Sequence, residues 1–411
     1  MLIKNAKLVG REKEMDILIR DGIFTRIEPN IDEENELEII DAKGYIVTPT
    51  FVNPHMHLDK VYTALKGRES EVETLEESIK IMHDMKRNYT VEDVKSRAIR
   101  AIKDCVSHGT TKIRTSVDID NIIDLIGLKG VIAAKEECND ICDIQIVAFP
   151  QEGIFNNEGT QELLWEAMEE GADLIGGMPA AEWTDEYSKK HINLVFEIAK
   201  NYDVDIDMHI DQTKDIFARS LEYTAMRSLE EGYHGRVTGG HCTSISYQND
   251  AHAEKVMKLL KLVDFNVCTN PQVLAIMGID REPRTRGVTR IREMVEMGIN
   301  IATAQDTICD GFHIFGKGDP LDYGLLCAYI SQYNTPATVK IVFDMITINA
   351  AKILRVDGSY GIKVGNKADL NIIEAPNIQE AFRLRADRKY VIKNGNIIVE
   401  NISSTKFHSE I

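Results

Sequence analysis

The segment IVTPTFVNPHMH (residues 46–57) predicts an apolar strand that ends in two histidines. Seven more apolar segments follow it along the chain, at residues 111–118, 143–151, 173–178, 205–210, 236–241, 264–270 and 300–306. Amphipathic segments that predict helices lie between them, at residues 75–86, 91–107, 161–170, 189–200, 217–231, 250–262 and 290–297. The middle of the chain therefore alternates strand and helix.

This alternation predicts an α/β fold built on a parallel (β/α)8 TIM barrel. An open, doubly wound sheet is the alternative architecture. Its dinucleotide-binding form carries a G-x-G-x-x-G turn after a strand, and no such turn follows any of the eight segments. The barrel is therefore the expected fold.

The two ends of the chain differ from this middle part. Short apolar or alternating segments at residues 3–9, 15–20 and 23–28, and again at 368–373, 390–392 and 397–400, predict strands. The dipeptides Asp21-Gly22 and Asn394-Gly395 are typical of hairpin turns. We expect both ends to form one small β-sandwich domain, from residues 1–50 and 355–411, beside a catalytic barrel domain at residues 51–354.

Composition excludes several classes of protein. The 411 residues carry a net charge of −18, which argues against nucleic acid as a partner, because binding a polyanion needs a basic face. No segment approaches the ~20 apolar residues of a membrane span, and the first residues show no signal-peptide pattern. The seven cysteines fit reduced thiols in a cytoplasmic protein. Cys138 and Cys142 could lie one helical turn apart, but without a second cysteine pair they make a weak zinc motif.

Polar residues occupy the ends of several predicted strands, where barrels of this type carry their catalytic groups. The first strand ends in His55 and His57, the fifth in His209, the sixth in His241 and the eighth in Asp306. His55 and His57 are two residues apart on an extended strand, so both imidazoles point to the same face. Such a pair alone could be two unrelated histidines. Together with three further ligand-type residues at strand ends, it predicts a metal site.

The predicted metal ligands are His55, His57, His209 and Asp306. A catalytic metal usually keeps an open position for water, whose pKa falls toward neutrality on binding. Metal-bound hydroxide would then be the nucleophile, and Asp306 could accept its proton. His241 could orient the hydroxide or polarise the substrate; the alternative is a hydrogen-bonded histidine behind the ligands. We expect zinc or iron, with manganese as the further candidate; nitrogen and oxygen ligands alone do not distinguish the three.

These segments resemble the amidohydrolase superfamily, and within it the cytosine-deaminase-like branch. The resemblance covers nearly the whole chain and rests on TPTFVNPHMHLDK (48–60), VAFPQEGI (147–154), DMHIDQT (207–213), GGHCTS (239–244), RTRGVTRIREMVEMGINIATAQD (284–306) and GIKVGNKADLNII (361–373). In binuclear relatives of such barrels a lysine at the end of the fourth strand bridges two metals. The fourth strand of this chain ends without a lysine, which favours one divalent ion.

The resemblance also implies roles for individual residues. It supports the four ligands, with His241 as a catalytic histidine beside them. Gln151, at the end of the third strand, would bind the polar edge of the substrate ring, because an amide offers a donor and an acceptor to an –NH–C(=O)– edge. Phe312 falls where cytosine deaminases carry an aromatic residue against the substrate; the alternative is an ordinary loop aromatic.

Other positions depart from the cytosine-deaminase pattern. Gln212 stands where those enzymes carry a glutamate that shuttles a proton, and an amide can hold a ring edge but cannot carry a proton. Thr307 stands where they have a second aspartate, and Asp310 cannot be assumed to substitute for it. Lys60 stands three residues after His57, and a lysine at this position resembles the pattern of the N-isopropylammelide hydrolases. Its ammonium could stabilise an oxyanion or a neighbouring acid, or it could be a surface lysine.

We therefore expect a metal-dependent hydrolase of a C–N bond that deaminates or dealkylaminates a small pyrimidine-, triazine- or lactam-type ring. A hydrolase that opens a cyclic amide or ureide is the first alternative. A catalytically silent relative that only binds is the second, but retention of the four ligands and of His241 argues against it. The expected partner is a small polar ring substrate, and the acidic surface is compatible with a homo-oligomer.

Overall fold

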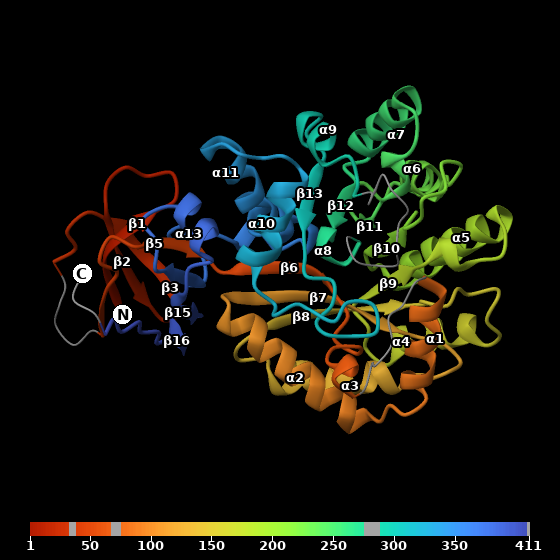
Figure 1. Ribbon diagram of the computed structural model, residues 1–411, viewed down its shortest axis with the longest axis horizontal. Helices are drawn as coiled ribbons and strands as arrows, with labels where there is room; N and C mark the ends of the chain where they lie inside the picture. Colours follow the sequence, from red (N-terminus) through yellow and green to blue (C-terminus); the bar gives the residue numbers. More distant parts are fainter. Residues whose placement is uncertain (33–37, 67–74, 275–287, 409–411) are drawn as a thin grey trace.

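A computed structural model describes residues 1–32, 38–66, 75–274 and 288–408 of the chain. Figure 1 shows two parts side by side: a large α/β barrel surrounded by helices, and a smaller strand-rich part that holds both termini. Among the described helices, none combines the length and the apolar run that a bilayer crossing needs.

Eight parallel strands form the barrel, in the order in which they follow along the chain. They are β6 (Phe51–Met56), β7 (Thr110–Asp118), β8 (Asp143–Phe149), β9 (Leu174–Gly177), β10 (Ile206–Ile210), β11 (Val237–His241), β12 (Asn266–Thr269) and β13 (Asn300–Thr303). A parallel bridge between Met56 and Asp306 brings the first and last strands together. This bridge nearly closes the cylinder, which confirms the predicted TIM barrel.

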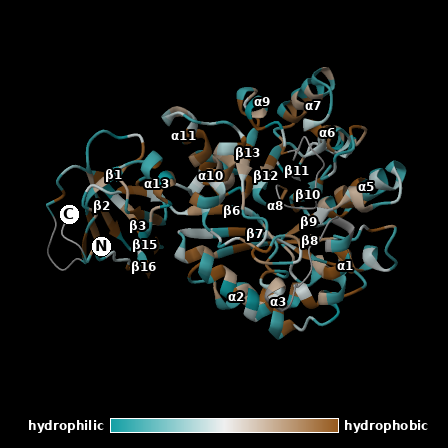
Figure 2. Cartoon of the chain, viewed as in Figure 1, coloured by the Kyte–Doolittle hydropathy of each residue, from teal (hydrophilic) through white to brown (hydrophobic). Residues whose placement is uncertain are grey.

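Helices cover the outside of the barrel. They are α1 (Leu75–Lys86), α2 (Val91–Ser107), α3 (Ile126–Glu137), α4 (Thr160–Glu169), α5 (Asp185–Tyr202), α6 (Ser220–Glu230), α7 (Asp250–Leu262), α8 (Pro271–Leu274), α9 (Ile291–Glu296), α10 (Pro320–Ile330), α11 (Pro336–Met345) and α12 (Ile348–Ile353). Each of these helices needs an apolar face to pack against its neighbours. In helix α2, Val94, Ala98 and Ala101 recur at helical spacing and are all buried. Figure 2 shows the matching mixture of hydrophilic and hydrophobic bands on the outer helices.

The smaller part is a mixed sheet built from both ends of the chain. Its strands are β1 (Leu2–Leu8), β2 (Met15–Arg20), β3 (Ile23–Glu28), β4 (Ile39–Asp41), β5 (Ile46–Pro49), β14 (Leu370–Ile373), β15 (Arg388–Lys393) and β16 (Asn396–Glu400). They run in the order β16-β15-β14-β5-β1-β2-β3, with β4 also paired to β1, and α13 (Ile378–Leu384) connects β14 to β15. One apolar core joins the N-terminal and C-terminal strands, including Ile17, Phe24, Leu370 and Ile392. The exact domain boundaries remain a prediction.

The structure corrects several predicted elements. Segment 46–57 is two strands: β5 pairs with β14 in the terminal sheet, and β6 begins the barrel after a break at Thr50. Strand β8 ends at Phe149 because Pro150 has no amide hydrogen for the ladder. Strand β13 ends at Thr303, so Asp306 lies in the loop after it. Helices α3, α8 and α10 to α13 were not predicted, and residues 284–287 of the fifth motif lie outside the described residues.

Candidate active site

The predicted metal ligands meet at the carboxyl end of the barrel. His55 lies near the end of β6 and His57 follows that strand, while His209 lies on β10. Asp306 is fixed against β6 by the backbone: its N–H donates to the His55 carbonyl at 3.0 Å, and its carbonyl accepts from the His57 N–H at 2.9 Å. The backbone contacts that close the barrel therefore also bring Asp306 next to the two histidines.

The spacing of the ligand atoms fits one shared ion. The Nε2 atoms of His57 and His209 are 3.0 Å apart. Asp306 Oδ1 is 3.5 Å from His57 Nε2 and 3.8 Å from His55 Nε2. Bonds of about 2.0–2.1 Å to a common ion place neighbouring ligand atoms roughly 3 Å or slightly more apart. The four predicted ligands thus form a set that could hold a single metal.

The hydrogen bonding of this cluster also fits the binding of a cation. His55 Nε2 and Asp306 Oδ2 are buried and have no hydrogen-bond partner among the described residues. Burial lowers the pKa of His55, His57 and His209 well below the usual range, which leaves each ring neutral, as a metal ligand must be. Burial, with the nearby Asp310, raises the pKa of Asp306 to about 8. Such a carboxylate needs a positive partner to be stable in its ionised form.

His241, at the end of β11, stands beside the four ligands. Its Nε2 atom is 4.0 Å from Asp306 Oδ2, and burial lowers its pKa to about 3. Behind it, Asn270 Nδ2 lies 3.5 Å from His241 Nδ1. Because an amide nitrogen only donates, this contact favours the tautomer with the hydrogen on Nε2, facing the site. Asn270 is therefore a residue behind the site that sequence reasoning missed.

The backbone around the ligands is unusual. His241 and Asp306 have φ values of 66° and 65°, a region that side chains other than glycine rarely adopt. Gly240 packs against the ring of His55: a Cβ atom added there would lie 3.0 Å from His55 Cε1. Unusual backbone and close approach at one site are typical of functional positions.

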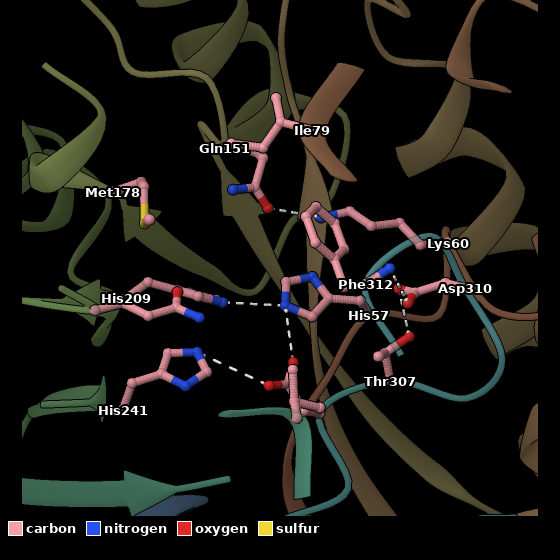
Figure 3. Close-up of a pocket in the computed structure, with 13 residues that line it drawn as sticks. His57, Lys60, Ile79, Gln151, Met178, His209, His241, Thr307, Asp310 and Phe312 are labelled. Atoms are coloured by element: carbon pink, nitrogen blue, oxygen red, sulfur yellow. Dashed lines mark hydrogen bonds and ion pairs between the residues drawn. The ribbon is translucent and has the colours of Figure 1, made fainter. Parts of the chain in front are cut away.

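A cavity of about 460 Å³ opens above the ligands (Figure 3). Nine of the ten predicted site residues line it, and His55 is the exception. The lining residues are His57, Lys60, Ile79, Gln151, Met178, His209, Gln212, His241, Val273, Asp306, Thr307, Asp310 and Phe312. Its mixture of apolar walls with a few polar groups is typical of a site for a small molecule.

Four lining residues were not predicted as site residues. Met178 follows β9, so its position after a barrel strand could have identified it. Ile79 comes from α1 and Val273 from α8, and helical residues carry no comparable signal. Asp310 carries the clearest chemistry of the four. The Thr307 hydroxyl donates to its Oδ2 at 2.6 Å, and the Phe312 N–H donates to its Oδ1 at 2.9 Å.

Lys60 is not a surface residue. Its side chain is 1% exposed, and its ammonium lies 2.7 Å from Asp118 Oδ1 and 2.8 Å from Gln151 Oε1. Figure 3 shows this contact between Lys60 and Gln151 at the edge of the cavity. Phe312 lies on the same side, with its ring centroid 5.8 Å from Lys60 Nζ. The structure thus brings Lys60, Gln151 and Phe312 together.

A second buried charge cluster lies behind Lys60. Lys86, the last residue of α1, forms ion pairs with Asp118, with Asp120 at 2.9 Å and with Glu152 at 3.1 Å. The negative charges of these carboxylates raise the pKa of Lys86 well above its usual range, although burial opposes the shift. Asp118 contacts both lysines and so connects α1 to Lys60 and the cavity edge.

The weak zinc motif is not supported by the structure. Cys138 is the residue that ends α3 and Cys142 directly precedes β8; both are buried. Among the described residues, the groups that could hold a metal include neither cysteine. All seven cysteines are unpaired thiols.

Comparison with known proteins identifies the family. Residues 38–399 match the amidohydrolase family. This chain belongs to the amidohydrolase family. The match confirms the predicted superfamily, and the protein is an enzyme of the class that hydrolyses carbon–nitrogen bonds.

The amidohydrolase is similar to several characterised proteins along nearly its whole length. It is 33% identical over 405 residues to N-isopropylammelide isopropyl amidohydrolase of Pseudomonas sp. (strain ADP), covering 98% of this chain and 97% of that protein. Its fold matches 5-methylcytosine deaminase from Klebsiella pneumoniae, liganded with 5-fluorocytosine, with a TM-score of 0.95 at 32% identity over 99% of each chain. N-isopropylammelide isopropylaminohydrolase from Burkholderia multivorans ATCC 17616 matches with a TM-score of 0.87 at 26% identity, over 97% of this chain and 98% of that one. These likenesses confirm the fold and the reaction class.

Proposed function

We propose that this amidohydrolase releases ammonia or an alkylamine from a small oxo-substituted pyrimidine or triazine ring. The observation that carries the proposal is the convergence of His55, His57, His209 and Asp306, with buried unpartnered atoms, at the floor of a cavity lined by apolar and polar side chains. The relatives named for 5-methylcytosine and for N-isopropylammelide support this substrate class.

The four ligands would hold one divalent ion. When bound, such an ion lowers the pKa of a water molecule and supplies a nucleophile at neutral pH. Asp306 would accept a proton from the attacking water at its carboxylate and return it to the leaving amine. His241 donates a hydrogen bond from Nε2 across the cavity floor and so stabilises the negative charge that develops at the attacked carbon's substituents.

The other cavity residues position the ring. Gln151 and Lys60 bind its polar edge, and the apolar walls at Phe312 and Met178 cover its faces. Gln212 lines the cavity and can hold a ring edge, but it cannot carry a proton. Asp310, a buried carboxyl group on the cavity wall whose pKa is raised by burial, is the acid available in place of a glutamate. Thr307 positions Asp310 through its hydroxyl.

A second candidate reaction is the opening of a cyclic amide or ureide. Gln212 favours it, because a ring carbonyl is already electrophilic and needs no protonated ring nitrogen. The product distinguishes the two reactions: the first releases an amine, whereas the second leaves the amine attached to an opened chain.

Several finer points belong to the same proposal. One ion is favoured over two because Met178 follows β9, where binuclear barrels carry a lysine. The nitrogen and oxygen ligands fit zinc or iron, with manganese as the further candidate. We also infer a cytoplasmic location from the seven reduced cysteines. A homo-oligomer is compatible with the strongly acidic chain.

The test is a substrate screen with enzyme loaded with zinc, iron or manganese. Amino-pyrimidines, alkylamino-triazines and cyclic ureides are assayed separately for released amine and for ring opening. Amine release from at least one ring supports the proposal, and ring opening alone supports the second candidate. Metal-loaded enzyme that is inert toward the whole panel contradicts both and favours a binding protein.

A matched variant tests the proton path. We expect Gln212→Glu to increase cytosine turnover, because the new carboxylic acid can carry a proton to the ring nitrogen. Conversion of cytosine to uracil, followed by absorbance, measures the change. An unchanged rate would show that the shape of the cavity, rather than the missing acid, excludes cytosine.

A further inference from the structure

The contact between Lys60 and Gln151 determines which end of the Gln151 amide faces the cavity. A lysine ammonium only donates hydrogen bonds, so the amide atom 2.8 Å from Lys60 Nζ must be the carbonyl oxygen Oε1. The other end, Nε2 with its two hydrogens, is left for the cavity. Figure 3 shows Nε2 directed away from Lys60, toward the side where Met178 and His209 lie.

This orientation is held firmly. Lys60 is 1% exposed and is paired with Asp118 at 2.7 Å. Asp118 in turn is paired with Lys86, which is held by Asp120 and Glu152. A flip of the Gln151 amide would set its N–H groups against a buried ammonium that cannot accept them, which is a costly arrangement.

The edge of the cavity at Lys60 and Gln151 therefore offers donors. An ammonium has three N–H groups, and contacts among the described residues account for two of those of Lys60. The nearby carboxyl group of Asp310 is already engaged by Thr307 and by the N–H groups of Phe312 and His313.

We propose that the donor pair Lys60–Gln151 selects rings that present an acceptor-only edge: a carbonyl oxygen beside a ring nitrogen without hydrogen, as in an ionised imide. A neutral –NH–C(=O)– edge sets its own N–H against these donors and leaves buried groups unpaired, which sites of this kind discriminate strongly. This refines the expectation that Gln151 serves an –NH–C(=O)– edge. It rests on the proposed function and narrows its substrate class.

The test is the binding of two inert rings of similar size, measured by calorimetry on the full-length, metal-loaded protein at mildly alkaline pH. Cyanurate is then an anion that has lost a ring N–H proton and so has an acceptor-only edge, and uracil is a neutral imide with N–H groups. We expect cyanurate to bind at least about tenfold more tightly. Equal affinity, or tighter binding of uracil, overturns the proposal.

An uncharged substitution separates hydrogen bonding from simple attraction of charge. Gln151→Met removes the amide donor without changing the charge of the protein, so cyanurate should lose about tenfold in affinity while uracil changes little. The exposed Gln161→Met on α4 is the matched control. A cyanurate preference that survives Gln151→Met in full overturns the proposal, because it would come from charge alone.

A second variant keeps the test decisive if Gln151→Met folds poorly. Lys60→Met frees the Gln151 amide to turn, while Lys86 still balances Asp118, so the preference for cyanurate should fall below about threefold. An unchanged preference contradicts the proposal. The substrate screen is scored separately. Amine release without cyanurate preference refutes only this inference, and cyanurate preference without amine release refutes only the proposed function.

Discussion

Two buried clusters at the mouth of the barrel both group possible metal ligands, but they balance their buried charge in different ways. The imidazole cluster contains His55, His57, His209, His241 and Asp306, and the lysine-filled cluster contains Lys86, Asp118, Asp120 and Glu152. Both bring at least three possible metal-ligand atoms within 4.8 Å of one another. Only the lysine-filled cluster contains a cation of its own, because Lys86 lies among the three carboxylates.

The difference indicates which cluster needs an ion. Buried charges are costly unless they are paired. In the described part of the chain, Asp306 forms no ion pair with a lysine or an arginine, and its partners are histidines that burial keeps neutral. The lysine-filled cluster balances its carboxylates with a cation of its own, whereas the imidazole cluster is the one that we propose binds an ion. Ligand-type residues within reach of one another are therefore not enough to identify a metal site.

The largest expected effect comes from removing one ligand of the imidazole cluster. His57→Ala should lose bound metal and more than about 10³-fold of activity, because the ion supplies the nucleophile. Elemental analysis of the purified protein and an amine-release assay measure the two losses. The exposed His234→Ala is the matched control. Full metal content in His57→Ala would remove His57 from the ligand set.

The second-largest effect is expected from removing the positive charge of Lys86 from the lysine-filled cluster. Lys86→Met leaves three carboxylates buried together, so the free energy of unfolding should fall by about 3–5 kcal/mol. Urea denaturation measures it, with the exposed Lys80→Met on the same helix as control. Added magnesium should restore part of the lost stability in Lys86→Met and none in the parent protein. A stability within about 0.5 kcal/mol of the parent would show that these carboxylates do not need Lys86.

The loss of stability at acidic pH should also depend on the lysine-filled cluster. Burial raises the pKa of Glu152, but the hydrogen bond from His83 and the charge of Lys86 prevail and lower it from 4.5 to about 2. The pKa of Glu152 is lower in the folded protein than in the unfolded chain. Its ionised form therefore stabilises the fold above pH 4.5, and this stabilisation is lost as the pH falls through about 2. Glu152→Gln should lower the free energy of unfolding by up to about 3 kcal/mol at neutral pH, and this free energy should then fall less steeply as the pH is lowered. Denaturation at neutral and acidic pH measures it, with the exposed Glu158→Gln as control; parallel curves for Glu152→Gln and the parent contradict it.

The imidazole cluster could be predicted from sequence, whereas the lysine-filled cluster could not. His55 and His57 alternate on one strand, and the remaining ligands follow strand ends, so barrel geometry alone brings them together. Lys86 ends an amphipathic helix, a position where a lysine is typical of a solvated face. Its burial depends on how α1 packs on the barrel, which is tertiary information.

The same distinction explains the errors in the fold. Segment 46–57 is apolar throughout, so its sequence does not reveal that β5 and β6 belong to different sheets. Helix α3 buries small residues such as Gly127 and Gly130 against its neighbours, and glycines weaken a helical pattern. Ile79 reaches the cavity from a helix, so no strand-end rule could identify it. Local periodicity predicts elements and strand-end residues, but not the packing that sets the walls of the cavity.

The smallest expected effect tests whether the ligands need their close packing. Gly240→Ala puts a methyl group 3.0 Å from His55 Cε1 and 3.3 Å from its Nδ1, so the ring must move by a few tenths of an ångström. Shifts in the groups that orient ligands typically cost 10–100-fold in metal affinity, and we expect a loss in that range with the fold intact. Competition with a chelator measures the affinity, and Gly358→Ala, where an added Cβ meets nothing within 4 Å, is the control. Unchanged affinity in Gly240→Ala would mean that the His55 ring can adjust without disturbing the ion, so the close contact at Gly240 would serve packing between β10, β11 and the first strand of the barrel alone.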